Sequence, residues 1–285
     1  MRSYPKILKR LSFPNALKTF GGDSFWITLN TRSKIFFVSL VFSISTICGC
    51  ASLGSYNAAT GQREFIMVPT DQEVTMGEDI HRKLLTEFKL SQDPDKVARI
   101  KRIGAKVSQV SDRQDYQYHF FLIEKNEINA FTTPGGNVYF FTGLLDKLHS
   151  DDQVAAVLAH EVGHCAARHT VKKFQAALSY SLIGSVLFNT MKMDGEVKHV
   201  AALGTDVVMN LVFSAYSRQD ELQADRLGIK YMDLAGYHVN AMIETFEVLK
   251  KESKGPEPPL FLRTHPYIDD RIEAAKKEIQ RIRSL

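Results

Sequence analysis

The stretch VLAHEVGHCAARH, residues 157–169, constrains the fold of this chain more than any other segment. It contains three histidines within ten positions and one glutamate between the first two. The preceding SDDQ, residues 150–153, has the spacing of a capping box and predicts the start of a helix that carries the stretch. Because helical residues four apart lie on one face, His160 and His164 can present two imidazoles to a single ion. The stretch is therefore either one half of a metal site or a histidine-rich helix without chemistry.

The glutamate between these histidines favours the metal site. Glu161 is placed where its carboxylate can reach a water on an ion held by His160 and His164. This is the H-E-x-x-H arrangement, in which zinc lowers the pKa of the water and the glutamate accepts its proton. A buried histidine pair capped by a surface glutamate is the alternative. Cys165 points about 100° away from His164 on a helix and is expected in the core, outside the ligand set.

A catalytic zinc site needs a third protein ligand beside one open position. The extended motif H-E-x-x-H-x-x-G-x-x-H is excluded, because Ala167 and Thr170 stand where its glycine and third histidine belong. His169 comes one position early, about 100° round a continuing helix. It is expected either to face solvent or to contact a ligand without binding the metal itself.

The second candidate for the third ligand is DELQAD, residues 220–225. Glu221 and Asp225 lie four apart on a predicted helix, and Ala224 beside them permits close approach to another helix. Glu221 can complete a site of two histidines and one glutamate, while Asp225 can orient a ligand histidine through its distal N–H. An exposed acidic face balanced by Arg218 and Arg226 is the alternative. Combined with the H-E-x-x-H motif, the pattern favours one zinc ion per chain.

The rest of the sequence predicts a mainly helical α+β domain. TDQE at 70–73 has capping-box spacing and opens a helix to about residue 88, and Asp93-Pro94 opens a second to about residue 110. Residues 116–141 are rich in β-formers, with a turn at Pro134-Gly135-Gly136. Further helices are expected over 170–190, 198–215, 217–235, 240–252 and 267–283, with a loop over 253–260. The apolar segment 174–190 is short for a membrane span and is expected to pack in the core, contact with a membrane surface being the alternative.

Length and charge narrow the class of protein. The 285 residues, 44% of them hydrophobic, suit one compact domain with a leader or at most two small domains. The net charge of +4 belongs to the leader, because residues 1–49 hold seven basic residues and one acid. From position 50 onward there are 29 basic and 31 acidic residues, a net charge of −2. No nucleic-acid partner is therefore expected.

The leader has the pattern of an export signal. Arg32 and Lys34 precede about fifteen mostly apolar residues, which fits a signal peptide and is short for a membrane span. ICGC at 47–50 resembles the lipobox of bacterial lipoproteins, with Cys50 as the lipidated residue. An uncleaved anchor helix is the alternative. The resemblance implies a signal peptide over 1–49 and a lipidated, flexible tether over 50–68, and Ala51 favours the outer membrane. Cleavage would leave Cys165 as the one free thiol, so no intramolecular disulfide is expected.

Several motifs in a fixed order resemble a known family. They are NAFTTPGGNVYFFTGLL (129–145), HEVGH (160–164), SRQDELQAD (217–225) and THPYIDDRI (264–272). Together they resemble the zinc endopeptidases of the HtpX and CAAX-prenyl-protease type, above all the soluble, exported branch of bacterial lipoproteins. The resemblance covers about residues 65–283. It implies a single zincin-like metallopeptidase domain over 69–285, in which the edge strand of a small β-sheet lies beside the active-site helix.

The resemblance also implies roles for particular residues. The zinc ligands would be His160, His164 and Glu221, with Glu161 as general base and Asp225 and Arg271 supporting the ligands. His265 would stabilise the oxyanion or, in a resting state, occupy the fourth position of zinc; a structural His-Pro turn is the alternative. Peptide would add as an extra strand to a hairpin. The substrate-binding residues of this hairpin would be Asn129, Ala130, Phe131, Gly135, Gly136, Val138 and Tyr139.

The expected activity is hydrolysis of internal peptide bonds, with Glu161 passing its proton to the leaving amine. Unfolded or misassembled envelope proteins in the periplasm suit a tethered, water-facing site as substrates. A binding module for clients or assembly machinery, with structural or latching zinc, is the alternative. Glu161 argues against that class, since a structural site needs no base and is usually closed by four protein ligands. A permanent fourth ligand at His265 would weaken the objection. The sequence shows no obvious motif for binding a free chain terminus, so an exopeptidase is not favoured.

Overall fold

The computed structural model describes residues 54–187, 203–255 and 257–284. The expected signal peptide (1–49), Cys50 and the first residues of the tether lie outside the described residues, as does part of the helix expected over 198–215. Among the residues described, no helix combines the length and apolar character needed to cross a bilayer.

A β-hairpin occupies most of the segment expected to be a flexible tether. Strand β1 (Ser55–Asn57) pairs antiparallel with β2 (Gln62–Glu64). The turn is stabilised by the Asn57 side chain, which accepts a hydrogen bond from the backbone N–H of Ala59, and by Gly61 at a φ of +68°. Lys172 donates a 2.7 Å hydrogen bond to Glu64 and so attaches the hairpin to helix α7 (His169–Leu187). Residues 55–64 therefore differ from a free linker because the turn and this ion pair fix them.

A three-stranded sheet forms within residues 116–141, the segment that is rich in β-formers. It contains β3 (His119–Ile123), β4 (Ala130–Thr133) and β5 (Asn137–Phe141) in the order β3-β5-β4. Strand β5 runs parallel to β3 and antiparallel to β4, so β4 is an edge strand. The predicted turn at Pro134–Gly136 is confirmed, and Gly135 and Gly136 both take positive φ angles there. Strand β4 lies against helix α6 (Asp151–Ala166), which carries the H-E-x-x-H motif.

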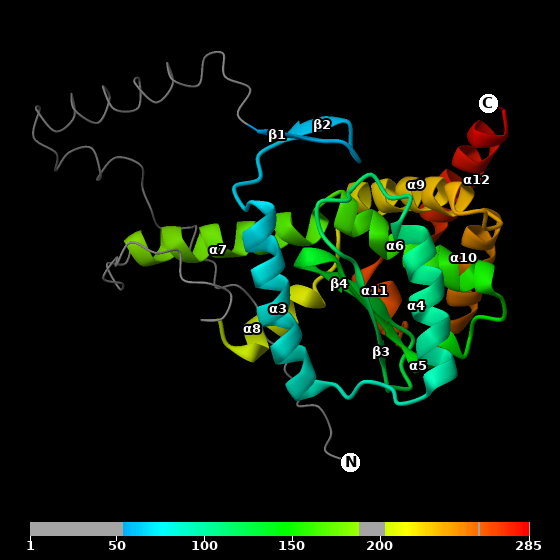
Figure 1. Ribbon diagram of the computed structural model, residues 1–285, viewed down its shortest axis with the longest axis horizontal. Helices are drawn as coiled ribbons and strands as arrows, with labels where there is room; N and C mark the ends of the chain where they lie inside the picture. The colour runs from blue at the N-terminus through cyan, green and yellow to red at the C-terminus, as the bar shows by residue number, and fades with distance from the viewer. Residues whose placement is uncertain (1–53, 188–202, 256, 285) are drawn as a thin grey trace, which may run out of the picture. The chain divides into compact units, whose positions relative to one another are not determined.

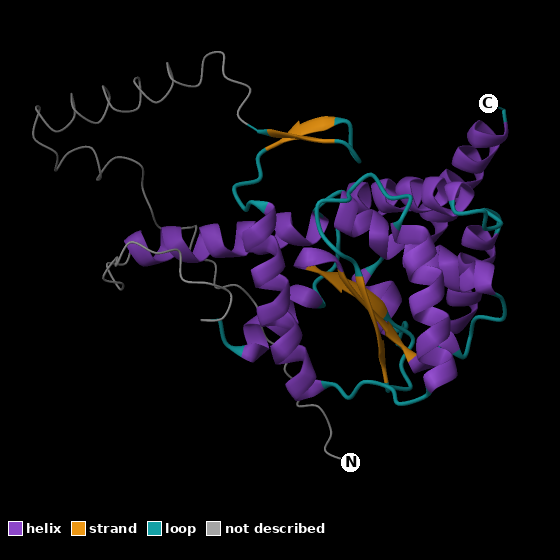
Figure 2. Cartoon of the chain, in the orientation of Figure 1, coloured by secondary structure: helices purple, strands orange, loops and turns teal. Residues whose placement is uncertain are grey.

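Helices make up most of the remaining domain, as expected, and surround the small sheet (Figures 1 and 2). Beside α6 and α7 they are α3 (Thr70–Glu87), α4 (Pro94–Ser108), α5 (Thr142–Leu145), α8 (Thr205–Val212), α9 (Arg218–Leu234), α10 (Ala241–Glu252), α11 (Leu260–Thr264) and α12 (Ile268–Arg283). The prediction of a mainly helical α+β fold is confirmed. It missed the short helix α11, which begins directly after the proline-rich loop.

The two predicted capping boxes have different outcomes. Ser150 caps α6 by accepting from the backbone N–H of Gln153, although the Gln153 side chain accepts from the N–H of His149. The box predicted at 70–73 is wrong, because Pro69 occupies the N-cap position of α3 and no side chain caps the helix. Glu73 is instead buried in an ion pair with Arg113. Glu73 therefore pairs with a residue that is distant in the sequence and not with the start of its own helix.

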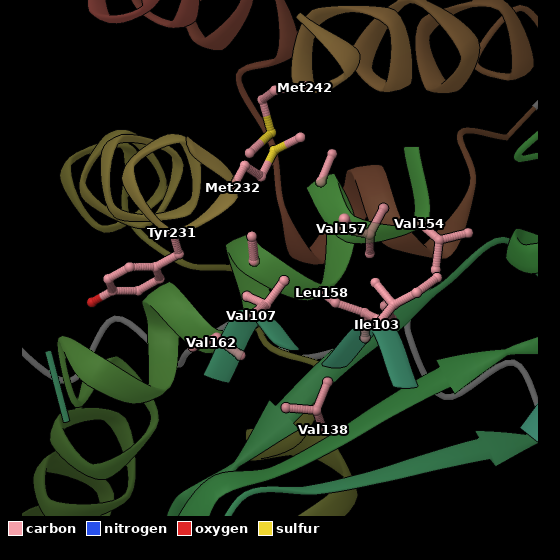
Figure 3. Packing of buried hydrophobic residues seen from close by; sticks show 14 of the residues in the cluster. Ile103, Val107, Val138, Val154, Val157, Leu158, Val162, Tyr231, Met232 and Met242 are labelled. Carbon is pink, nitrogen blue, oxygen red and sulfur yellow. The ribbon is translucent and has the colours of Figure 1, made fainter. Parts of the chain in front are cut away.

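Helix α6 runs through the core, where all its residues from Gln153 to Ala166 are buried. Its apolar side chains pack among those of α4, β5, α9 and α10 (Figure 3). The figure labels Val154, Val157, Leu158 and Val162 of α6 beside Ile103, Val107, Val138, Tyr231, Met232 and Met242. Each such side chain contributes roughly 1.5–3 kcal/mol when fully buried. The core therefore holds the motif-bearing helix in place.

Small residues bring α6 and α9 into close contact. A Cβ added at Gly163 would lie 2.7 Å from the backbone oxygen of Ala224, and one at Gly228 would lie 3.0 Å from the backbone nitrogen of His160. Neither position can hold a larger side chain without moving backbone. The expected role of Ala224 in permitting helix approach agrees with this geometry.

We expect Gly163→Ala to destabilise the domain by about 1–3 kcal/mol, since overpacking against backbone outweighs the ~1 kcal/mol that alanine gains in a helix. Urea unfolding of the purified protein measures the change. The matched control is Gly255→Ala, whose added Cβ meets nothing closer than the Glu257 oxygen at 3.8 Å. A Gly163→Ala protein as stable as this control would contradict the close packing of α6 on α9.

Candidate metal centre

Three elements bring four possible metal ligands together. Helix α6 supplies His160 and His164, α9 supplies Glu221, and His265 follows directly after α11. One ligand atom from each residue lies within 4.8 Å of all the others, and all four residues are buried. The sequence placed the first three in the ligand set and left two roles open for His265.

The ligand atoms converge at hydrogen-bond distances. The Nε2 atoms of His160 and His164 are 3.0 Å apart. His265 Nδ1 lies 3.2 Å from His160 Nε2 and 3.0 Å from Glu221 Oε1. Glu221 Oε1 is also 3.4 Å from His164 Nε2. In this conformation His265 is therefore a member of the cluster.

The donor set fits zinc. Two imidazoles and one carboxylate are a ligand combination found in catalytic zinc sites, and a further histidine can take the fourth tetrahedral position. Next to the cluster, both carboxylate oxygens of Glu161 and the Nε2 atom of His265 are buried without a hydrogen-bond partner among the described residues. Buried polar atoms are rarely left unpartnered, so these atoms indicate a place for a metal ion and the groups that it binds.

Two further residues hold the ligands from outside. Asp225 Oδ1 lies 2.7 Å from His160 Nδ1, the ring nitrogen that points away from the cluster. Arg271 donates two hydrogen bonds of 2.8 Å to Asp225 and forms a 2.7 Å ion pair with Glu221. Asp225 and Arg271 thus contact possible ligand residues from outside the cluster, and their supporting role stays a prediction. The alternative of an exposed acidic face is excluded, since Glu221 and Asp225 are buried and Arg218 pairs with Asp270 instead.

The electrostatic environment of the cluster favours the protonation states in which Glu221 and His164 can bind a metal ion. Burial alone would raise the pKa of Glu221, but the guanidinium of Arg271 holds it well below its ordinary value. Burial lowers the pKa of His164 well below its ordinary value, so its imidazole is neutral. A carboxylate and a neutral imidazole are the forms that bind metal.

Glu161 has a different environment from Glu221. Its carboxylate is fully buried, and this burial raises its pKa despite the nearby histidines. Its Oε1 atom lies 3.5 Å from His265 Nε2. A carboxylate with a raised pKa that is held beside a metal cluster is suited to accept and return a proton.

The seven residues expected to bind substrate lie in and around the edge strand, but their side chains are buried. Asn129 precedes β4, and neither atom of its side-chain amide has a partner among the described residues. Phe131 and Tyr139 stack on each other at 4.8 Å, within an aromatic cluster that also contacts Phe121. Ala130 and Val138 are in the core, and Gly135 and Gly136 form the turn beside α3. Substrate contact by these residues stays a prediction.

Sequence reasoning missed two aromatic residues at the centre. Tyr216 stacks on the ring of His164 at 4.0 Å, and Phe261 stacks on His265 at 4.5 Å. The Nζ atom of Lys173 lies 3.6 Å from the centre of the Tyr216 ring. The one signal for Tyr216 is its position directly before Ser217, which caps α9.

Cys165 belongs to the core, as expected. Its Sγ atom lies 2.7 Å from Thr132 Oγ1, and burial raises the pKa of the thiol to about 12. Cys165 does not belong to the cluster of possible metal ligands, and a thiol that stays protonated near neutral pH is a poor nucleophile.

Comparison with known proteins agrees with this geometry. The model of peptidase family M48 matches residues 94–279, which is more than half of the chain. The chain therefore belongs to peptidase family M48, and its class is that of the zinc metalloendopeptidases.

Individual relatives carry more specific names. The beta-barrel assembly-enhancing protease of Escherichia coli is 30% identical over 222 residues, covering 75% of this chain and 45% of the relative. The mitochondrial metalloendopeptidase OMA1 of Schizosaccharomyces pombe is 28% identical over 222 residues, covering 76% of this chain and 64% of the relative. The chain spans about half the length of the bacterial relatives that it matches.

We expect Arg271→Leu to destabilise the metal-free protein by about 3–5 kcal/mol, because it leaves two buried carboxylates without their cation. Denaturant unfolding in the presence of a chelator measures the loss. Arg218→Leu is the control, since this exposed arginine pairs with Asp270 at the surface and is worth about 1 kcal/mol or less. Equal losses of unfolding free energy in the two variants would show that the buried ion pairs of Arg271 stabilise the fold no more than a surface ion pair does.

Proposed function

We propose that this chain is a zinc-dependent endopeptidase of the bacterial cell envelope, which hydrolyses internal bonds of unfolded or misassembled proteins. The observation that carries the proposal is the buried carboxylate of Glu161, which has no hydrogen-bond partner among the described residues, beside the cluster of His160, His164 and Glu221. A purely structural metal site has no use for such a group.

The chemistry divides between the metal and the chain. Bound zinc would supply Lewis acidity that polarises the scissile carbonyl and makes water nucleophilic near neutral pH. Glu161 would accept the proton of the attacking water and then deliver it to the leaving amine. Asp225 and Arg271 would keep His160 and Glu221 oriented throughout.

The edge strand β4 supports binding of extended peptide. It has one paired neighbour, β5, and lies against α6, so a peptide strand added to its other side would run past the metal centre. The unpartnered amide of Asn129 at the start of this strand could then bind peptide backbone. Because the side chains of this region are buried, substrate entry requires part of the domain to move.

The position of His265 supports a resting state of the enzyme. Its Nδ1 atom points into the ligand cluster and its side chain is fully buried, stacked on Phe261. We infer that His265 would hold bound zinc as a fourth ligand in this conformation and would have to leave before water and substrate can bind. Stabilisation of the oxyanion would then require a second position of the same side chain.

The names of the relatives and the leader of the chain support a location and a substrate class. The names of the bacterial relatives refer to assembly of β-barrels, which supports envelope proteins as substrates here. Lipidation at Cys50 would anchor the enzyme in the periplasm, on the outer membrane. A latched zinc lipoprotein acting as an assembly factor is the second candidate, and the fully enclosed position of His265 favours it.

We expect Glu161→Gln to abolish cleavage of an unfolded protein such as casein while the protein keeps one equivalent of zinc. The amide cannot accept the proton, whereas the ligand residues are unchanged. Activity and metal content are measured on the same preparations. Glu244→Gln, in α10, serves as the matched control. Undiminished cleavage by Glu161→Gln would rule out its role as general base.

We expect His265→Ala to cleave casein faster than the wild type, since removal of the fourth donor opens a position on zinc. Initial rates at saturating zinc test this expectation. A loss of activity with zinc retained would instead assign His265 to transition-state stabilisation. If wild type, Glu161→Gln and His265→Ala all bind zinc and none cleaves protein, the assembly-factor candidate replaces the peptidase.

A further inference from the structure

Each of the two helical ligand histidines has a partner at its second ring nitrogen. For His160 the partner is Asp225, at 2.7 Å. For His164 it is another histidine: His164 Nδ1 lies 2.9 Å from the Nδ1 atom of His169. His169 is 3% exposed, so it does not face solvent.

A break in the helix brings His169 to this place. On a continuing helix His169 would lie about 140° from His164 around the axis. Helix α6 ends at Ala166, however, and Arg168 takes a left-handed conformation with a φ of +57° before α7 begins. The guanidinium of Arg168 forms a 2.9 Å ion pair with buried Glu73 and donates to the backbone oxygen of Val68. These contacts hold an otherwise disfavoured backbone conformation.

The far side of His169 contacts the first turns of α9. Its Nε2 atom lies 2.9 Å from Gln223 Oε1 and 3.4 Å from Asp220 Oδ1. Both neighbours are oxygen acceptors, so the proton of the neutral His169 ring belongs on Nε2. The Nδ1 atom of His169 is then an acceptor. It can pair with His164 only if His164 carries its own proton on Nδ1.

This proton order leaves Nε2 of His164 free for a metal ion. That atom is the one that faces His160 and Glu221. A ligand histidine commonly donates its other N–H to an oriented acceptor, which fixes its tautomer and ring orientation. In this protein the acceptor for one ligand is a carboxylate and for the other a neutral imidazole.

We propose that His169 is a positioning residue for the metal centre: through its Nδ1 atom it fixes the tautomer and orientation of His164. The proposal rests on the metal site described under the proposed function. A neutral acceptor suits this place because the buried carboxylates of Glu161, Glu221 and Asp225 face one buried guanidinium, that of Arg271. Another carboxylate at His169 would add a charge that the interior stabilises poorly.

The test compares His169→Ala with His169→Asn in the full chain. Asparagine places an acceptor oxygen near the position of Nδ1, whereas alanine removes the acceptor. Exposed His149→Ala is the control. Zinc affinity is measured by competition with a chelator, and the ligand geometry by the visible absorption of the Co²⁺-substituted protein. Circular dichroism of each metal-free variant establishes that it is folded.

Removing the acceptor should weaken zinc binding about 10–100-fold and alter the Co²⁺ spectrum. The asparagine variant should recover most of the affinity and the spectrum, and the control should match the wild type. Wild-type affinity in His169→Ala, or an equal loss in both His169 variants, would overturn the proposal. Failure of the wild type to bind one equivalent of zinc would instead refute the metal site itself.

Discussion

The packing of α6 against α9 is the contact on which the metal centre depends. Gly163 and Gly228 let the two backbones approach to a distance that no larger residue allows. This approach places Glu221 within 3.4 Å of His164. It also sets Asp225 against His160 and the start of α9 against His169. One pair of helices therefore supplies three possible metal ligands and the contacts to the outward-facing nitrogen of both histidines.

Charge balance explains why this buried cluster suits a divalent ion. Three carboxylates, those of Glu161, Glu221 and Asp225, are buried together with a single guanidinium, that of Arg271. When all are ionised the neighbourhood has two negative charges in excess, which the interior tolerates poorly. A bound Zn²⁺ ion would supply the matching charge. The raised pKa of Glu161 is consistent with this excess, because burial penalises its ionised form first.

The parts of the site that follow from local spacing were predictable, and those that depend on backbone irregularity were not. His160 and His164 could be paired from a four-residue interval, and Glu221 and Asp225 from a second one. The sequence left two places open for His169, and the choice between them depends on the left-handed conformation of Arg168, which forms an ion pair with distant Glu73. Glu73 also forms a buried ion pair with Arg113, and it takes no part in capping α3. In the rest of the fold, the hydrophobic pattern and the turn residues were enough to predict the β-rich segment, the Pro-Gly-Gly turn and most helix boundaries.

Complete burial of the ligand cluster also governs how fast a metal ion can be exchanged. His160, His164, Glu221 and His265 have almost no solvent-exposed surface, so neither a chelator nor a competing ion can approach them while the domain keeps this conformation. Uptake and release of a metal ion would then require opening of the chain, on the timescale of local unfolding. Equilibrium affinity and residence time become separate properties. A zinc ion acquired during folding would stay with the molecule even where free zinc is scarce.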